Sequence, residues 1–368
     1  MGVREGRFAA QGLDGRVAGR QGRGPQQKRG APPVNEPARG RALGRGSPPT
    51  RGRRRLRALL AVLVAAAVVV PLTAASRPRI PAPFPADLAV PTASTLEDAY
   101  ASNRANAESA ARMAAAHGDL HRASADDALA QPSRRLLTFD GRGSGRVTEV
   151  FGDLAHAHRV AVLVPGADTS LDTYERFRAS AAAVHDALAQ RGSGGRDTAV
   201  VAWLGYTTPD TVSTSALTPG RADEAAPELR EFVSTMRGIT GPDTRISILC
   251  HSYGSVVCGR AADRLNIEEL VLLASPGAGT ESVAGLRTRA RVWAARGGGD
   301  WVAEVPKIEV DLLGTTVGFG SDPVSPGFGA RVFSAGGGGH SDYFRPGSVS
   351  LANLARIVLG ETTEVTRA

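Results

Sequence analysis

One short stretch of the chain has residue types and spacing that indicate covalent chemistry. Cys250-His251-Ser252-Tyr253-Gly254 matches the G-x-S-x-G nucleophile elbow, except that Cys stands at its first position. The β-branched run Arg245–Leu249 before it predicts a strand, and the small residues after it predict a helix. A strand-to-helix turn exposes the serine hydroxyl at the C-terminal edge of a sheet, where ligands bind in α/β folds. Ser252 is therefore the candidate nucleophile.

Two further residues complete a candidate catalytic triad. A serine hydroxyl needs a base to take its proton, and that base needs a carboxylate to orient it. Where this elbow occurs, the order along the chain is Ser, acid, His. Asp300 and His340 follow Ser252 in that order, each at the end of a glycine-rich stretch after an expected strand. The sequence predicts that Asp300 orients His340 and that His340 is the base.

Each assignment has an alternative. Asp322 also lies between Ser252 and His340, but its Asp-Pro sequence is typical of a turn, and Asp300 follows the penultimate strand more closely. Ser252 is also suited to capping a helix N-terminus, and His340 to an exposed loop. His251 adjoins the nucleophile, yet on a sharp turn it points away from its neighbour's reacting face, so it is a poor base.

An oxyanion hole needs two backbone N–H donors near the nucleophile. One is expected from Tyr253, the residue after the serine, and the other from the loop after an early strand. That loop contains Gly166, Ala167 and Asp168. We predict the N–H of Ala167 as the second donor, with Gly166 as the next choice, and we expect Asp168 to shape the loop without a catalytic role.

The net charge of +8 is unevenly distributed. Residues 1–57 hold 15 Lys and Arg against 3 Asp and Glu, a net charge of +12, which leaves −4 for the rest of the chain. The globular part is mildly acidic, so no nucleic-acid partner is expected for it. The Gly, Arg and Pro-rich tail predicts a disordered, solvated segment, which we favour over contact with RNA or anionic lipid.

An uncharged apolar run, Ala58–Ala75, follows Arg53, Arg54, Arg55 and Arg57. It is long enough to span a bilayer, and the arginines place its N-terminal side in the cytoplasm. We expect a membrane anchor with the catalytic domain outside the cytoplasm. Two alternatives remain open: a signal peptide cleaved near Ala75, giving a secreted protein, and a buried core helix.

The two cysteines, Cys250 and Cys258, flank the elbow. One ends a strand and the other lies in the next helix, so a bridge would distort the backbone, and we expect both to be free buried thiols. The cysteine count indicates no metal site, and no cofactor is predicted. The Gly336–Gly339 run lacks a following Lys-Ser/Thr and is read as a flexible loop rather than a phosphate cradle.

The remaining pattern predicts an α/β fold with a mostly parallel sheet and helices on both faces. A Pro-rich linker (76–93) leads to a helical segment (94–133), with a capping box at Ser94–Glu97 and a second helix over Ser124–Ala130, and then to the catalytic domain (134–368). Expected strands cover Arg135–Phe139, Arg146–Phe151, Arg159–Val164, Thr198–Leu204, Arg245–Leu249, Leu270–Ala274, Arg289–Ala294 and Arg331–Ser334. Expected helices cover Thr173–Gln190, Arg221–Arg237, Gly254–Leu265 and Val349–Leu359.

Several motifs together carry a family resemblance. They are Ser102-Asn103-Arg104, Leu136-Leu137-Thr138-Phe139-Asp140, Phe151-Gly152-Asp153-Leu154, Val162-Leu163-Val164-Pro165-Gly166, His251-Ser252-Tyr253-Gly254-Ser255 and Gly339-His340-Ser341. On these residues the chain resembles a family of α/β-hydrolase proteins of unknown function from high-GC bacteria. The resemblance implies a hydrolase fold with Ser252 and His340 as catalytic residues, and it implies no substrate. Cys250 departs from the usual glycine.

These observations favour an extracytoplasmic serine hydrolase that acts through an acyl-enzyme on a small-molecule ester, in preference to an amide or thioester. The alternatives are an acyltransferase with the same triad and a non-catalytic binding module on a hydrolase scaffold. Residues 205–219 follow a strand and are small and polar, so a bulky lipid substrate is not favoured. Trp203 and Trp293 are expected in the core, while Trp301 is a candidate for the pocket wall.

Overall fold

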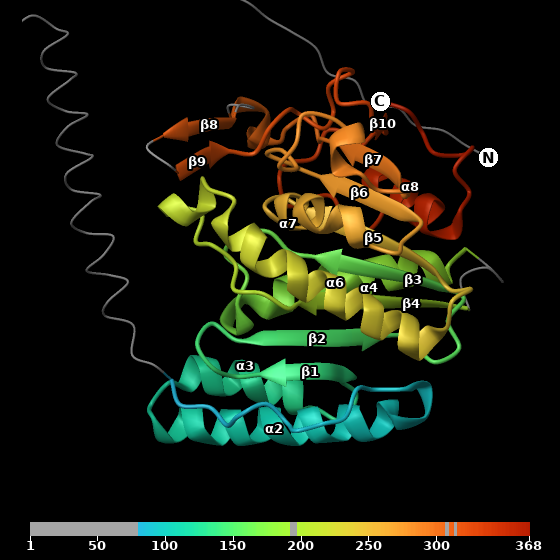
Figure 1. Ribbon diagram of the computed structural model, residues 1–368. Coiled ribbons are helices and arrows are strands. Elements are labelled where there is room, and N and C mark those ends of the chain that lie inside the picture. Colours follow the sequence, from blue (N-terminus) through green and yellow to red (C-terminus); the bar gives the residue numbers. More distant parts are fainter. Residues whose placement is uncertain (1–79, 192–196, 306–308, 313–314) are drawn as a thin grey trace, which may run out of the picture. The chain divides into compact units, whose positions relative to one another are not determined.

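The computed structural model describes residues 80–368 apart from 192–196, 306–308 and 313–314 (Figure 1). The basic tail 1–57 and the apolar run 58–75 lie outside the described residues, so the predictions made for them stay predictions. Across the part of the chain that is described, no helix combines the length and apolar character needed to cross a bilayer. Residues 80–92 form neither helix nor strand.

An eight-stranded sheet forms the centre of the domain, with the order β1-β2-β4-β3-β5-β6-β7-β10. From β4 to β10 every neighbouring pair is parallel, while β1 and β2 pair antiparallel at one edge. The strands are β1 (Leu136–Asp140), β2 (Arg146–Phe151), β3 (Arg159–Val164), β4 (Thr198–Leu204), β5 (Arg245–His251), β6 (Glu269–Leu273), β7 (Arg291–Ala295) and β10 (Arg331–Val332). The predicted α/β-hydrolase architecture is confirmed.

Helices cover both faces of this sheet (Figure 1). One face carries α6 (Gly220–Thr240) and α7 (Gly254–Ala261), and the other carries α4 (Tyr174–Ala189) and α8 (Val349–Leu359). The central strands are buried on both sides, with Val160 to Val164 at 0 % exposure, which explains their continuous apolar runs. Two hydrophobic cores result, one on each face of the sheet.

Two helices precede the sheet and pack against its β1 edge. They are α2 (Leu96–Ala116) and α3 (Leu120–Ala130). The buried amide of Asn103 on α2 donates to the backbone oxygens of Leu136 and Leu137 at 3.2 and 2.9 Å, which fixes the helix to the strand. The helix α3 begins earlier than expected, because Asp119 caps it by accepting from the Arg122 N–H at 2.9 Å.

Two local predictions differ from the structure. The capping box forms at Thr92 and Thr95, where the Thr92 N–H donates to the Thr95 hydroxyl at 2.9 Å, because a 3₁₀ turn (Ala93–Thr95) precedes α2. The hairpin of β8 (Glu309–Leu312) and β9 (Thr315–Gly318) was not predicted, since strands of four residues are too short to show a period. Trp203 and Trp293 are core residues, as predicted, with 2 % and 4 % exposure.

Candidate active site

The predicted nucleophile sits on a sharp turn between β5 and α7. Ser252 follows β5 directly and has φ of 54°, a left-handed conformation that is rare for a residue with a side chain. The turn is held in place by the Ser252 N–H, which donates to the Leu273 backbone oxygen of the neighbouring strand at 2.9 Å. Such strained residues persist only where the surrounding structure fixes them, and they cluster at functional sites.

Two glycines let other backbone segments approach the serine closely. A Cβ at Gly254 would lie 2.5 Å from the Pro165 backbone oxygen, and a Cβ at Gly166 would lie 2.7 Å from the Ser252 Cβ. Real Cβ contacts are never this short, so both positions require glycine. The loop after β3 therefore lies directly against the nucleophile, as the sequence predicted.

The prediction of free thiols at Cys250 and Cys258 is wrong. The two residues form a disulfide, with their Cα atoms 6.5 Å apart. The elbow reverses the chain so sharply that the second turn of α7 returns beside the end of β5, within the separation that a disulfide spans without distortion. The cysteine in place of the usual first elbow glycine is thus one half of a buried crosslink.

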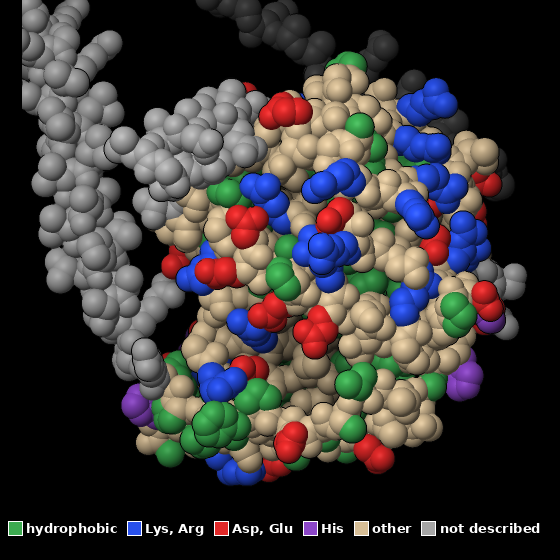
Figure 2. Space-filling view, in the orientation of Figure 1, with side chains coloured by type: hydrophobic (Ala, Val, Ile, Leu, Met, Phe, Trp, Pro, Cys, Tyr) green, Lys and Arg blue, Asp and Glu red, His purple; other side chains and the backbone are tan. Residues whose placement is uncertain are grey.

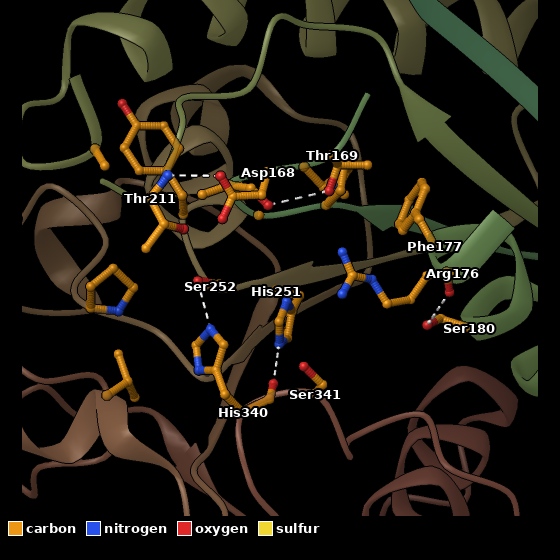
Figure 3. A pocket seen from close by; sticks show the side chains of 18 of the residues that line it. Asp168, Thr169, Arg176, Phe177, Ser180, Thr211, His251, Ser252, His340 and Ser341 are labelled. Carbon is orange, nitrogen blue, oxygen red and sulfur yellow. Dashed lines mark hydrogen bonds between the residues drawn. The ribbon is translucent and has the colours of Figure 1, made fainter. Parts of the chain in front are cut away.

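Ser252, His340 and Asp300 lie in hydrogen-bonding contact. The His340 Nε2 is 3.0 Å from the Ser252 Oγ (Figure 3). Its Nδ1 is 2.8 Å from the Asp300 Oδ1. The Asp300 side chain is fully buried and that of His340 is 17 % exposed. This is the geometry in which a histidine takes a proton from a serine while a carboxylate fixes its tautomer.

Asp300 is held as a carboxylate by its hydrogen bonds. Its Oδ2 accepts from the Tyr343 hydroxyl at 2.6 Å, and its Oδ1 accepts from the Val302 N–H at 2.9 Å. Burial alone raises the pKa of Asp300, but the bonds from Tyr343, Val302 and His340 outweigh it and hold the pKa below its ordinary value. Asp300 is therefore ionised at neutral pH.

The loops that carry Asp300 and His340 are joined to each other by their glycines. The Gly298 N–H donates to the Gly336 oxygen at 2.9 Å, and the Gly299 N–H donates to the Gly338 oxygen at 3.2 Å. The Tyr343 hydroxyl also accepts from the Gly297 N–H at 2.7 Å. The stretch expected to be a flexible loop is thus bonded along its length to the acid's loop.

His251 supports the base and does not replace it. Its Nε2 donates to the His340 backbone oxygen at 2.7 Å, and its ring packs against those of His340, Tyr343 and Phe344. Burial, with a smaller contribution from His340, lowers the pKa of His251 to about 4. It is therefore neutral at pH 7, and the structure directs it at the His340 backbone rather than at Ser252.

The alternative acid, Asp322, is placed elsewhere. Its Oδ2 pairs with Arg296 at 2.6 Å, and its Oδ1 accepts from the Val324 N–H at 3.2 Å. The Asp-Pro sequence forms a turn, in which the Ser325 N–H donates to the Asp322 oxygen at 2.9 Å. The structure thus brings Asp300 to His340 and leaves Asp322 in an ion pair outside the pocket lining.

The backbone donors expected for an oxyanion hole lie beside the serine. Gly166, Ala167 and Tyr253 line the same pocket as Ser252. Neither the Ala167 N–H nor the Tyr253 N–H donates to an acceptor within the described residues. Backbone donors this close to a buried turn are ordinarily paired, so two such groups next to a nucleophile are suited to a substrate oxygen.

Asp168 shapes the loop that carries Ala167. It has φ of 57°, and its Oδ1 accepts from the Thr211 N–H at 2.8 Å while its own N–H donates to the Pro209 oxygen at 3.0 Å. The Tyr206 hydroxyl donates to the Pro165 oxygen at 2.7 Å. Segment 205–219 is thus bonded to the oxyanion loop and forms one wall of the pocket (Figure 3).

The pocket has a volume of about 350 Å³ and a mainly apolar wall. The Trp301 ring lies 4.6 Å from that of His340, which confirms its expected place in the wall. The other apolar side chains come from α4, from the loops after β7 and β9 and from the segment after His340, and they include Phe177, Val302, Val305, Phe319 and Phe344. No cluster of metal-ligating side chains occurs among the described residues.

Tyr343, the support of Asp300, and Arg176, a charged pocket residue, were not singled out from the sequence. Tyr343 lies three residues after His340, and an aromatic hydroxyl so close to a candidate base was the available signal. Arg176 lies in the first turn of α4, outside every motif, and no sequence signal connects it to Ser252.

Comparison with known proteins agrees with this fold. Residues 140–310 match a family model described as an alpha/beta hydrolase. An uncharacterised protein of Mycobacterium tuberculosis (strain H37Rv) is 28 % identical over 256 residues, which cover 59 % of this chain and 37 % of that relative. The chain thus corresponds to little more than a third of the relative's length. The predicted family resemblance is confirmed.

Two solved structures each match about three-fifths of this chain. One is a serine hydrolase without a lid from Xanthomonas campestris, with a TM-score of 0.39 and 16 % identity, covering 63 % of this chain and 95 % of that one. The other is a predicted CIB-like hydrolase from Thermoplasma acidophilum, with a TM-score of 0.40 and 16 % identity, covering 62 % of this chain and 96 % of that one.

Proposed function

We propose that this member of the α/β-hydrolase fold family is a serine hydrolase that cleaves small carboxylic esters through an acyl-enzyme. The single observation that carries the proposal is the contact of His340 with both Ser252, at 3.0 Å, and Asp300, at 2.8 Å. Each of the three comes from a different loop at the C-terminal edge of the sheet. Such convergence is the arrangement that general-base activation of a serine requires.

In the first half-reaction, the Ser252 Oγ attacks the ester carbonyl carbon and His340 Nε2 takes the hydroxyl proton. Asp300 stabilises the resulting imidazolium, and the N–H groups of Ala167 and Tyr253 bind the oxyanion. The tetrahedral intermediate then collapses as the C–O bond to the alcohol breaks. His340 gives its proton to the departing alkoxide, which leaves as the alcohol, and the acyl group remains on Ser252.

In the second half-reaction, water takes the place of the alcohol. His340 removes a proton from the water as its oxygen attacks the acyl carbon. The intermediate collapses with cleavage of the bond to the Ser252 Oγ, which regains its proton from His340, and the carboxylic acid leaves. The apolar pocket wall suits a short acyl chain, since its volume of about 350 Å³ is at the small end for ligand sites.

Labelling of Ser252 by a fluorophosphonate tests the proposal. We expect the probe to modify the full chain at Ser252 and to leave Ser252→Ala unlabelled. The full chain should hydrolyse para-nitrophenyl acetate, butyrate and valerate, and kcat should be about 10⁴-fold or more lower in Ser252→Ala. Equal labelling of the Ser252→Ala protein would overturn the proposal. Transfer of the acyl group to an added alcohol in preference to water would favour the acyltransferase reaction.

We also propose that the catalytic domain works outside the cytoplasm. The Cys250–Cys258 disulfide supports this location, because such bonds persist in oxidising compartments and are rare in the cytosol. The apolar run 58–75 after the cluster of arginines supports it independently. If the protein is anchored, protease added to intact cells should digest the catalytic domain; if it is secreted, the domain should be found in the medium. A domain that stays protected from protease until the cells are lysed would contradict the proposal.

A further inference from the structure

One charged side chain in the wall of the active-site pocket is not used by the proposed reaction. Arg176 lies in the first turn of α4 and lines the same pocket as Ser252 and His340. Figure 3 shows its guanidinium directed toward the middle of the pocket, on the side where His251 lies. An arginine in this position faces the space that a bound substrate fills.

Arg176 differs from its charged neighbours on the helix in having no partner. Glu175 pairs with Arg134 at 3.0 Å, and Arg178 pairs with the buried Glu149 at 3.2 Å. The side chain of Arg176 makes no hydrogen bond or ion pair with any residue that the structure describes. Its five N–H donors are therefore available to a ligand, whereas the adjacent charges stabilise the fold.

The other titratable groups of the pocket leave this positive charge without a counterion. Asp168 is the carboxylate of the pocket wall, and it accepts from the Thr211 N–H, beside which it lies in Figure 3. His251 is partly buried, and its lowered pKa keeps it neutral at pH 7. The other residues labelled beside Arg176 in Figure 3 are uncharged: Phe177, Ser180 and Ser341. An anionic group that enters this side of the pocket can therefore pair with Arg176 without displacing a carboxylate of the described residues.

We propose that Arg176 is a specificity-determining residue that binds an anionic group, a carboxylate or a phosphate, on the substrate of the hydrolase. The inference rests on the proposed serine hydrolase function for its position in the reaction. Arginine binds carboxylate and phosphate oxygens through a planar pair of N–H groups, so it fixes orientation as well as charge. The preferred substrates are then esters that are charged at one end and apolar near the scissile bond.

Matched esters test the preference. The first pair is the para-nitrophenyl monoester of glutarate against para-nitrophenyl valerate, which places the anion on the acyl side. The second is para-carboxyphenyl valerate against phenyl valerate, which places it on the alcohol side. We expect the anionic member of one pair to have the higher kcat/KM. The preference ratio, kcat/KM for the anionic ester divided by kcat/KM for the neutral ester, should fall about 10- to 100-fold in Arg176→Gln. Arg176→Lys is expected to retain part of the preference.

Arg264→Gln is the control, because Arg264 is 77 % exposed and does not line the pocket. It removes the same charge from the chain and is expected to leave both ratios unchanged. A ratio that is the same in Arg176→Gln and in the unmodified protein for both pairs would overturn the inference. An equal loss for neutral and anionic esters would also overturn it, since that result indicates a structural role.

Binding gives a readout that does not depend on turnover. The probes are glutarate and inorganic phosphate, each titrated calorimetrically into Ser252→Ala. At least one of them is expected to bind about 10-fold or more weakly to the double variant Ser252→Ala/Arg176→Gln. Undiminished binding, or no binding of either anion by Ser252→Ala, would contradict the inference. If anion binding depends on Arg176 while no ester is cleaved and no probe labels Ser252, the hydrolase function fails and the anion site stands. If Ser252 is labelled and neutral esters are preferred, the anion site alone fails.

Discussion

The two sides of the candidate active site are built in different ways, and the nucleophile side is the more local. Ser252 is positioned by a turn between adjacent elements, β5 and α7, with its left-handed backbone and the disulfide between Cys250 and Cys258. These features all lie within a segment of about a dozen residues. Two contributions come from elsewhere in the chain: the Leu273 oxygen that accepts from the Ser252 N–H, and the close approach of Gly166.

The base side is assembled from distant segments. Asp300 and His340 are separated by 40 residues in the chain, and hydrogen bonds between their two loops bring them together. Tyr343 joins both loops, because its hydroxyl accepts from the Gly297 N–H and donates to Asp300. Asp300 caps a short 3₁₀ helix, Trp301–Glu304, and the disulfide lies in the other part of the site.

The difference matches the different requirements that the proposed reaction sets for the nucleophile and for the base. The nucleophile must sit at one fixed place against the oxyanion donors, and backbone strain with a disulfide supplies that rigidity. In the proposed reaction the base forms and breaks hydrogen bonds in each half-reaction, and the hydrogen-bonded glycine-rich loops orient it. Substitutions on the two sides should therefore have different effects on activity and stability.

The largest expected effect separates the two candidate acids on the base side. Asp300→Asn should lower kcat for para-nitrophenyl butyrate by about 10⁴-fold, because an amide at this position no longer fixes the required His340 tautomer. Asp322→Asn is the matched control. It loses its pairing with Arg296, a partly exposed bond, and should change kcat by less than about 3-fold. Comparable losses in the two variants would contradict the assignment of Asp300.

A single methyl group tests the nucleophile side. In Gly166→Ala the new Cβ would lie 2.7 Å from the Ser252 Cβ, so either the serine or the oxyanion loop must move. A displacement of this kind should lower kcat/KM by about 10²-fold. Gly327→Ala is the control, since a Cβ there meets nothing within 4 Å. Full activity in Gly166→Ala, with a thermal midpoint like that of the control, would show that the contact is unimportant.

The local character of the nucleophile side explains why the sequence predicted so much of it. The strand before Ser252, the turn and the helix after it follow one another directly, and the hydrophobic pattern of the other parallel strands is continuous because both faces are buried. The order nucleophile, acid, base selected Ser252 and His340, and the position of Asp300 soon after the penultimate strand favoured it over Asp322.

Features that depend on three-dimensional proximity were not predictable in the same way. The disulfide was missed because its geometry depends on how far the chain turns back after Ser252, which a linear pattern does not specify. Asp322 could not be excluded as the acid until its contact with Arg296 was known. Arg176 reaches the pocket only because α4 packs beside the oxyanion loop, and an isolated arginine on a helix carries no sequence signal.

Removing the disulfide should affect stability more than catalysis. The double variant Cys250→Ala/Cys258→Ala releases a crosslink across eight residues, and the loss of loop-closure entropy predicts a decrease of about 2–3 kcal/mol in the free energy of unfolding. Neither cysteine lines the pocket, so the folded variant should keep activity within about 10-fold. Urea unfolding measures the first quantity. An unchanged midpoint and slope would mean that α7 is held by packing alone.

His251 links the two sides, because it adjoins Ser252 and donates to the His340 backbone oxygen. Its pKa is lowered from 6.5 to about 4 in the folded protein, so between these values the unfolded chain binds more protons. Its contribution to stability is complete above about pH 6.5 and is lost as the pH falls toward 4, with a loss of about 2 kcal/mol by pH 5. His251→Gln keeps an N–H donor but does not titrate, so its free energy of unfolding should decrease less between pH 7 and 5. If the free energy of unfolding falls equally in the two proteins between pH 7 and 5, the pKa of His251 is not lowered by folding and the prediction is wrong.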